Sequence, residues 1–168
     1  MSPGPDRSPS STEPTLRDYR DGDQHDIVAL ITAVYGEYGD ICEPDGFDND
    51  LLTIPETLLA KGGHFAVLER DGRVVGCVGV RDCGDGLAEL KRCYLARELR
   101  GRGLGSKLLT HALDWARGRG FTRMELWSDV RFAEGHRLYT RHGFEQGEQT
   151  RTLADINQSV EAYFRREL

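Results

Sequence analysis

A short segment near the middle of the chain combines three glycines with two arginines. It reads Arg100-Gly101-Arg102-Gly103-Leu104-Gly105-Ser106 and separates a predicted strand from a predicted helix that begins at Leu104. Glycine lets backbone N–H groups turn inward around an anion, because no Cβ stands in the way. The helix N-terminus adds unpaired donors and a partial positive charge, and the two arginines add full charges. The segment therefore predicts a cradle for a pyrophosphate group.

Two common phosphate-binding loops do not fit this segment. A Walker A loop needs Gly-Lys-Ser/Thr, whereas the order here is Gly105-Ser106-Lys107. A Rossmann fingerprint needs the spacing GxGxxG, whereas Gly101, Gly103 and Gly105 are two residues apart. A plain flexible turn is the remaining alternative, but turns seldom combine this glycine density with flanking arginines.

Charge is unevenly distributed along the 168 residues, whose formal net charge is -6. Residues 1–90 carry 7 basic and 18 acidic side chains, and residues 91–141 carry 12 and 5. A basic segment in an acidic protein indicates either nucleic acid or a polyanionic cofactor such as a nucleotide. Nucleic acid is disfavoured because this segment lacks interleaved exposed aromatic residues.

The elements that must position the glycine segment follow from hydrophobic periodicity and turn residues. Strands are predicted at residues 15–19, 64–70, 73–81, 87–95, 123–127, from 144 onward and at 160–166, and helices at 21–38, 55–60, 104–118 and 133–141. Asp71-Gly72 indicates a hairpin because this dipeptide tolerates positive φ. The order predicts an α/β fold whose first half is mostly antiparallel and whose second half is β-α-β-α-β.

One domain is predicted, spanning residues 15–168. Residues 1–14 are rich in proline and serine and are expected to form a disordered tail. No stretch approaches the roughly 18 consecutive apolar residues of a membrane helix, and the tail lacks the apolar core of a secretory signal. We therefore expect a soluble, cytoplasmic protein.

Metal-ligand motifs are absent from the sequence. The cysteines show no CxxC spacing and the histidines no HExxH pattern, so no metal site is predicted. We expect reduced core cysteines and ordinary surface or core histidines. The cysteines are Cys42, Cys77, Cys83 and Cys93, and the histidines are His25, His64, His111, His136 and His142.

Three motifs in register resemble the GNAT acetyltransferase superfamily. The segment from Arg100 to Gly105 is similar to its Gln/Arg-x-x-Gly-x-Gly/Ala loop, which binds the pyrophosphate of acetyl-CoA. Glu89-Leu-Lys-Arg-Cys-Tyr-Leu95 resembles the preceding strand, and Leu138-Tyr139-Thr-Arg-His-Gly143-Phe144 resembles the Leu-Tyr-x-x-x-Gly-Phe signature. The similarity covers residues 65–144.

The resemblance implies a GNAT fold: a mixed, mostly antiparallel sheet of six to seven strands, splayed at a bulge and flanked by about four helices. It implies acetyl-CoA as co-substrate and no metal. Phe132, Gly135 and Tyr139 share one helical face, which in the family lies along the cofactor. An asparagine is common in the family where Phe132 stands, and the phenylalanine side chain has no polar atom to replace its contact with the cofactor. The implied cofactor-binding residues are Cys93, Tyr94, Leu95, Arg100, Gly101, Arg102, Gly103, Leu104, Gly105, Ser106, Phe132 and Gly135.

Acetyl transfer to an amine needs a base, an acid for the leaving thiolate and a donor for the oxyanion. By resemblance Tyr139 takes the acid role and the strand amide near Leu95 serves the oxyanion. Glu89 is the best base candidate, because it is the one carboxylate in its strand and by alternation shares a pleat face with Cys93 and Leu95. A cross-strand salt bridge from Glu89 to Lys91 or to an arginine is the alternative.

The predicted activity is therefore N-acetylation of a primary amine by direct attack in a ternary complex. The alternative is a non-catalytic acyl-CoA-binding regulatory module. The acceptor is a small molecule or a protein amine rather than nucleic acid or membrane, and a homodimer stays open. An acidic cluster before Leu51 predicts a cationic acceptor, whereas an ordinary solvated loop is the alternative. This cluster consists of Glu37, Asp40, Glu43, Asp45, Asp48 and Asp50.

Overall fold

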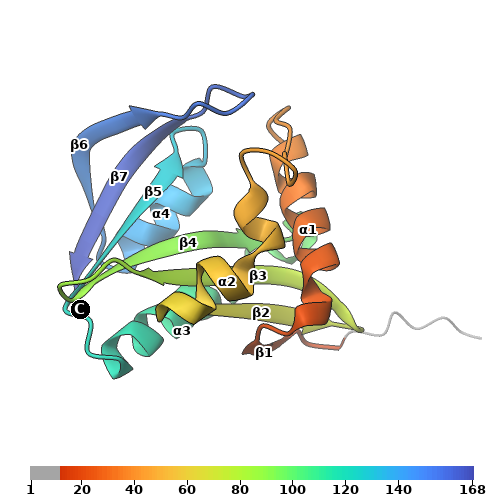
Figure 1. Ribbon diagram of the computed structural model, residues 1–168, viewed down its shortest axis with the longest axis horizontal. Coiled ribbons are helices and arrows are strands. Elements are labelled where there is room, and N and C mark those ends of the chain that lie inside the picture. The colour runs from red at the N-terminus through yellow and green to blue at the C-terminus, as the bar shows by residue number, and fades with distance from the viewer. Residues whose placement is uncertain (1–11) are drawn as a thin grey trace, which may run out of the picture.

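The fold is built on one seven-stranded sheet (Figure 1), seen in a computed structural model that describes residues 12–168. The strands are β1 (Thr15–Asp18), β2 (His64–Arg70), β3 (Arg73–Asp82), β4 (Leu87–Leu95), β5 (Arg123–Asp129), β6 (Glu145–Thr152) and β7 (Val160–Glu167). Their order is β1-β2-β3-β4-β5-β7-β6, and among the described strands only β4 and β5 pair in parallel. The predicted tail falls outside the described residues except for its last three.

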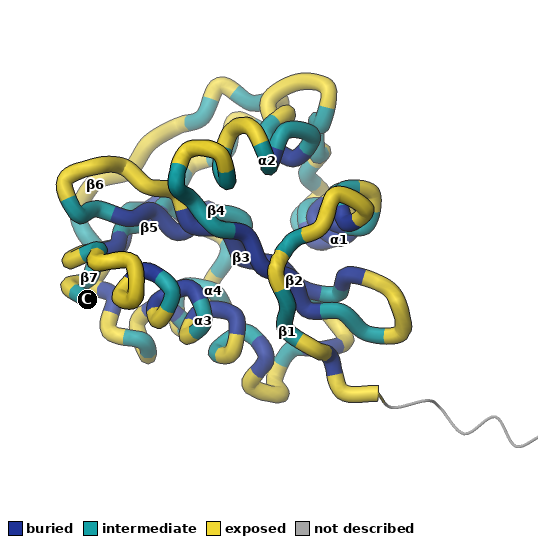
Figure 2. Tube along the Cα trace, turned by 60° about the horizontal axis from the view of Figure 1, so that its bottom comes forward, coloured by how far each residue is buried: buried dark blue, intermediate teal, exposed yellow. Residues whose placement is uncertain are grey.

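Helices cover both faces of the sheet. The helices are α1 (Gln24–Gly36), α2 (Ile54–Thr57), α3 (Leu104–Gly118) and α4 (Ala133–Arg141). Short 3-10 turns lie at Asp21–Asp23, Asn49–Leu52, Leu59–Lys61 and Arg97–Leu99. Figure 2 shows α1 and α2 on one face and α3 and α4 on the other. Two apolar clusters result, one beneath α1 and one beneath α3, and this arrangement confirms the predicted fold class.

Local sequence signals explain where several elements turn. Asp71 and Gly72 have φ values of 52° and 74°, as the predicted hairpin between β2 and β3 requires. Gly143, with φ of 84°, follows the end of α4 in the left-handed conformation that commonly terminates a helix. The chain then forms β6 at the sheet edge and returns as β7, which lies between β5 and β6.

Strands β4 and β5 separate after a short pairing. Leu87–Glu89 pairs with Arg123–Glu125, and beyond these residues the two strands share no register. On its other side β4 carries a bulge, because Gly79 pairs with Lys91 and Cys77 pairs with Tyr94. Three steps along β4 thus match two steps along β3. The extra residue is absorbed at Arg92, whose φ is 50°.

The bulge reverses which side chains face each side of the sheet. Ala88 and Leu90 belong to the cluster beneath α3, and Cys93 and Leu95 also pack against that cluster. Glu89 lies on the opposite face. The expectation that Glu89 shares a pleat face with Cys93 and Leu95 is therefore wrong, because simple alternation fails when one extra residue enters a strand.

Two further expectations concern the membrane and the cysteines. In the described residues no helix is long and apolar enough to cross a membrane. All four cysteines are free thiols, and Cys77 is buried as expected. Cys83 is instead exposed, because it lies in the turn between β3 and β4.

Candidate active site

Two cavities open where β4 and β5 separate. The first, here called the chamber, has a volume of about 400 Å³ and lies on the α1 and α2 side, with Tyr35, Leu58 and Phe65 among its lining residues. The second, here called the groove, has a volume of about 520 Å³ and lies along the N-terminus of α3 and one face of α4. The two cavities share five lining residues, and this shared wall lies at the splay. The shared residues are Cys93, Tyr94, Ser128, Phe132 and Tyr139.

The glycine segment forms one end of the groove. Four residues of the predicted cofactor site line it, namely Gly101, Gly103, Gly105 and Ser106. Gly101 and Gly103 have φ values of 77° and 80°, and no atom lies within 4 Å of a Cβ built at either position. Glycine is thus required there for its backbone conformation rather than for lack of space. Gly103 is also the N-cap of α3, so the unpaired N–H groups of that helix lie at this end of the groove.

Arg100 holds the loop in place rather than offering a free charge. Its guanidinium donates to the Leu95 carbonyl oxygen from Nε at 3.1 Å and from one terminal nitrogen at 3.0 Å. It also donates to both Glu37 carboxylate oxygens, at 2.9 and 2.8 Å. Arg100 lines the groove, but its charge is already paired with Glu37.

Unlike Arg100, two residues of the predicted set do not line the groove, whereas two arginines outside that set do. Leu104 is buried in the core beneath α3, and Arg102 is exposed outside the groove. Arg137 and Arg141 of α4 line the groove, and neither forms an ion pair within the described residues. A spacing of four residues places both on the same side of the helix. This spacing of two arginines, in the same helix as Gly135, could have identified them in the sequence as residues of the groove.

The remaining predicted cofactor residues form the walls of the groove. Phe132, Gly135 and Tyr139 of the α4 region line it together, as helical spacing predicts. The β4 residues Cys93, Tyr94 and Leu95 line it as well. The Phe132 ring packs on Tyr38 with centroids 4.6 Å apart. Burial raises the pKa of the Cys93 thiol to about 12, so this thiol stays protonated at neutral pH.

Tyr139 lies at the junction of the chamber and the groove. Its buried ring packs against Phe144 and Phe164, with centroids 6.0 and 5.8 Å away. Its hydroxyl forms no hydrogen bond within the described residues, yet no fully buried polar side-chain atom there lacks a partner. The hydroxyl is therefore accessible from the cavities. Burial, reinforced by the neighbouring Cys93 and Tyr94, raises the pKa of this phenol well above its usual value.

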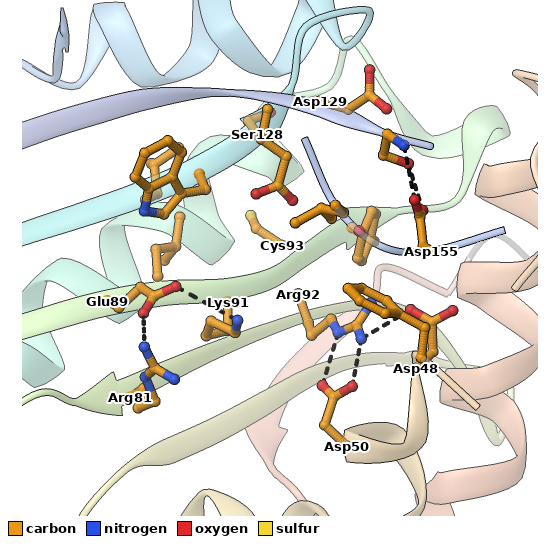
Figure 3. A pocket seen from close by; sticks show the side chains of 18 of the residues that line it. Asp48, Asp50, Arg81, Glu89, Lys91, Arg92, Cys93, Ser128, Asp129 and Asp155 are labelled. Atoms are coloured by element: carbon orange, nitrogen blue, oxygen red, sulfur yellow. Dashed lines mark hydrogen bonds and ion pairs between the residues drawn. The ribbon is translucent and has the colours of Figure 1, made fainter. Parts of the chain in front are cut away.

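Glu89 lies in the chamber wall between two cations (Figure 3). Its buried carboxylate forms a salt bridge with Arg81 and lies 3.5 Å from the Lys91 Nζ. The Cys83 thiol approaches the same carboxylate at 3.9 Å. The alternative of a cross-strand salt bridge to an arginine is thus confirmed by Arg81 of β3, and Lys91 adds an ion pair from the same strand as Glu89. The role of Glu89 as a base stays a prediction.

Most of the acidic cluster is neutralised by arginines. Arg92 contacts Asp48 at 3.1 Å and Asp50 at 2.5 Å (Figure 3), and it donates to the Tyr35 hydroxyl at 3.0 Å. Asp40 is paired with Arg131, and Glu37 is paired with Arg100. The cluster therefore fastens its loop to β4 and to the segments that follow β4 and β5, and it is not a free patch of negative charge.

The chamber still has an acidic balance, because seven acidic and four basic residues line it. Six of the seven carboxylates form salt bridges with arginine or lysine. Among the described residues, Asp155 is the one chamber carboxylate without such a partner. It accepts hydrogen bonds from the Ser159 backbone N–H at 2.8 Å and the Ser159 hydroxyl at 2.7 Å. Asp155 lies in the connection between β6 and β7 and faces the chamber (Figure 3).

The family model described as "Acetyltransferase (GNAT) family" matches residues 25–144, which include the glycine loop, the splay and α4. The chain belongs to the GNAT acetyltransferase family. The matched residues contribute to both the chamber and the groove, so the family assignment covers the whole candidate site apart from the part contributed by β6 and β7.

Individual GNAT relatives agree with this assignment. The chain is 30% identical over 138 residues to the "Uncharacterized N-acetyltransferase YjgM" of Escherichia coli, covering 79% of this chain and 82% of that protein. It is 34% identical to the "Probable N-acetyltransferase camello" of Xenopus tropicalis, covering 71% of this chain but only 58% of that protein. A GNAT phosphinothricin acetyltransferase from Sinorhizobium meliloti, solved in complex with acetyl-CoA, shares the fold with a TM-score of 0.74 at 20% identity. That match covers 94% of this chain and 89% of the other.

Proposed function

We propose that this GNAT domain transfers the acetyl group of acetyl-CoA to a primary amine by direct attack in a ternary complex. The shared wall between chamber and groove carries the proposal. A cofactor lying in the groove and an amine lying in the chamber meet at Tyr139 and Cys93, where the two cavities join. Bringing both reactants to one point is the main requirement of a direct bimolecular transfer.

The groove fits the chemistry of acetyl-CoA. The N-terminal N–H groups of α3 and the left-handed Gly101 and Gly103 suit the pyrophosphate. We assign Arg137 and Arg141 to the phosphates, because their charges are free of ion pairs within the described residues. Beyond Glu89, the edge of β4 that faces β5 has no strand partner in the described chain, which leaves backbone groups for the pantetheine amides.

The bound thioester supplies an activated carbonyl, and the residues of this chain move the protons. The attacking amine must lose a proton as the C–N bond forms and the C–S bond breaks. Glu89 faces the chamber, but Arg81 and Lys91 engage its carboxylate. We assign Glu89 to accept that proton through water, because direct contact with the amine requires one of these ion pairs to open.

Tyr139 is assigned to the departing sulfur. Its raised pKa keeps the phenol protonated at neutral pH, so its accessible hydroxyl is a donor. A thiol has a reference pKa of about 8.5, which lies below that of this phenol. A hydrogen bond that stabilises the thiolate is therefore favoured over complete proton transfer from Tyr139.

Cys93 is the alternative acceptor of the acetyl group in a two-step reaction through a covalent acyl-enzyme. Its pKa of about 12 leaves almost no thiolate at neutral pH, and the thiolate is the nucleophilic form. This supports direct attack by the amine.

The acceptor is proposed to be cationic, either a small molecule or a protein amine. The chamber has more acidic than basic residues, and Asp155 is free of cationic partners within the described residues. A carboxylate in the chamber wall attracts and orients an ammonium group. Asp155 therefore replaces the acidic cluster as the specific basis for a cationic acceptor.

A pair of matched glycine variants tests the cofactor site. Gly103 and Gly84 have the same φ of 80° and no atom within 4 Å of an added Cβ, but only Gly103 lines the groove. Gly103→Asp should weaken acetyl-CoA binding in titration calorimetry at least 100-fold, whereas Gly84→Asp should bind normally, because it introduces the same charge and backbone strain elsewhere. The Arg137→Ala/Arg141→Ala double variant should also weaken binding and reduce its salt dependence.

The outcome for acceptors separates the enzyme from a regulatory module. Release of free CoA thiol with a primary amine supports the transferase. Tight acetyl-CoA binding with no thiol release across polyamines, aminoglycosides, amino acids and protein N-termini would instead support the non-catalytic alternative. Equal binding by the Gly103→Asp and wild-type proteins would refute the groove as the cofactor site.

A further inference from the structure

Three potential metal ligands converge away from the active site. They are Asp18 at the end of β1, His64 at the start of β2 and His111 in the middle of α3. One ligand atom from each lies within 4.8 Å of the other two. Asp18 and His64 are 46 positions apart in sequence, and His64 and His111 are 47 apart, so no short sequence motif indicates the cluster.

The histidine nitrogens point at each other. The Nε2 atoms of His64 and His111 are 2.9 Å apart, and the His64 Nε2 lies 3.7 Å from an Asp18 carboxylate oxygen. With metal–ligand bonds of about 2.05 Å, these separations subtend angles of about 90° and 129° at a common ion, on either side of the tetrahedral value. Two ligands of one ion lie at most about 4.1 Å apart, which is twice the bond length. The ligand atoms of Asp18 and His111 lie within 4.8 Å of each other, so they reach this distance with a movement of less than about 1 Å.

The surroundings pack against one ligand and leave another exposed to solvent. His64 stacks on Trp115, with ring centroids 4.9 Å apart and planes 9° apart, and its side chain is only 12% exposed. The Asp18 side chain is 81% exposed. The histidine pair is a preorganised set of ligands, and the exposed carboxylate beside it gives an ion access from solvent.

The cluster is separate from the chamber. Along β2, Phe65 and Val67 pack in the cluster beneath α1, whereas Ala66 and Leu68 pack beneath α3. By alternation His64 faces α3, which is the face opposite the chamber. None of the three ligands lines the chamber or the groove.

We propose that Asp18, His64 and His111 form a binding site for a divalent transition-metal ion, with Zn²⁺ the best match and water as the fourth ligand. Imidazole nitrogens favour zinc and its neighbours, whereas calcium and magnesium take oxygen ligands. The bound ion links β1, β2 and α3, so its binding free energy adds to the stability of the fold.

Calorimetric titration of chelator-treated protein with Zn²⁺ tests the site. One equivalent should bind to the wild type, and Zn²⁺ should raise its Tm. His111→Ala and His64→Phe should each lose at least about 100-fold in affinity, since loss of an outer-shell partner alone costs up to that much. His64→Phe keeps a ring to stack on Trp115. Asp18→Asn changes an exposed side chain that can be replaced without disturbing the core, so it still tests the site if the histidine variants misfold.

Two controls make the result decisive. His25→Ala replaces an exposed histidine of α1 outside the cluster and should bind Zn²⁺ like the wild type. Cys83→Ser disrupts the other group of nearby potential ligands, which comprises Cys83, Glu89 and Glu125. Absence of binding, equal binding by Asp18→Asn and wild type, or loss of binding in Cys83→Ser alone would overturn the proposal. The histidines would then be only a hydrogen-bonded pair.

Discussion

Replacing Arg92 with methionine should destabilise the protein strongly, although the side chain lies beside a cavity. Arg92 lies at the β4 bulge and makes four hydrogen bonds: two to Asp50 at 3.0 and 2.5 Å, one to Asp48 at 3.1 Å and one to Tyr35 at 3.0 Å. Methionine keeps much of the aliphatic stem and removes the charge and all four donors.

The expected loss of folding stability depends on how the two carboxylates are solvated once Arg92 is gone. Asp50 is 38% exposed, so water can solvate it after the change, whereas Asp48 is only 6% exposed. Asp48 keeps the Glu43 backbone N–H at 2.8 Å and the Tyr35 hydroxyl at 3.3 Å, but no cation. Removing one partner from a buried ion pair costs about 3–5 kcal/mol, so we expect Arg92→Met to lower the free energy of unfolding by that amount.

Urea unfolding followed by circular dichroism measures this change, with the m-value as a check on two-state behaviour. Adding Asp48→Asn removes the buried carboxylate charge that has lost its cation. The double variant should therefore regain about 1–3 kcal/mol of unfolding free energy relative to Arg92→Met alone. A loss in stability below about 1 kcal/mol for Arg92→Met, or simple additivity of the two substitutions in the double variant, would show that the Arg92 ion pairs do not stabilise the loop.

Four other predictions test catalysis, recognition and stability. Glu89→Gln should lower kcat about 100-fold or more if its carboxylate accepts the amine proton, and a normal rate and pH profile would move the base elsewhere. Tyr139→Phe should lower kcat with little change in acetyl-CoA affinity, and unchanged turnover would make the ring purely structural. Asp155→Asn should raise the acceptor KM and weaken its dependence on salt, whereas Asp45→Asn, which lies outside the chamber, should not. Burial raises the pKa of Asp23, but hydrogen bonds from the Arg17 side chain and the Arg20 backbone N–H lower it by more, so the net pKa is lowered. Its stabilising effect is therefore full above the ordinary aspartate pKa of about 3.9 and fades as pH falls through the lowered value, so Asp23→Asn should cost more stability at pH 7 than at pH 2, as thermal melts can check.

Much of the fold and most residues that line the groove could be predicted from the sequence because the signals are local. Alternation and helical spacing placed nearly every element, and Asp71-Gly72 fixed the first hairpin. The left-handed Gly101 and Gly103 at the start of α3 followed from glycine density between a strand and a helix. Each of these features depends on residues within a few positions of each other.

Tertiary structure alone decided the features that depend on partners distant in sequence. The insertion of β7 between β5 and β6 depends on pairing energies that no local pattern reports. The bulge at Arg92 moved Glu89 to the face opposite Cys93, because one extra residue reverses the alternation on which the prediction relied. Long-range pairing likewise turned the acidic loop into a set of arginine salt bridges and brought His64 to His111. A sequence shows which charges and ligands are present, but only the fold determines which of them meet and which remain free to act.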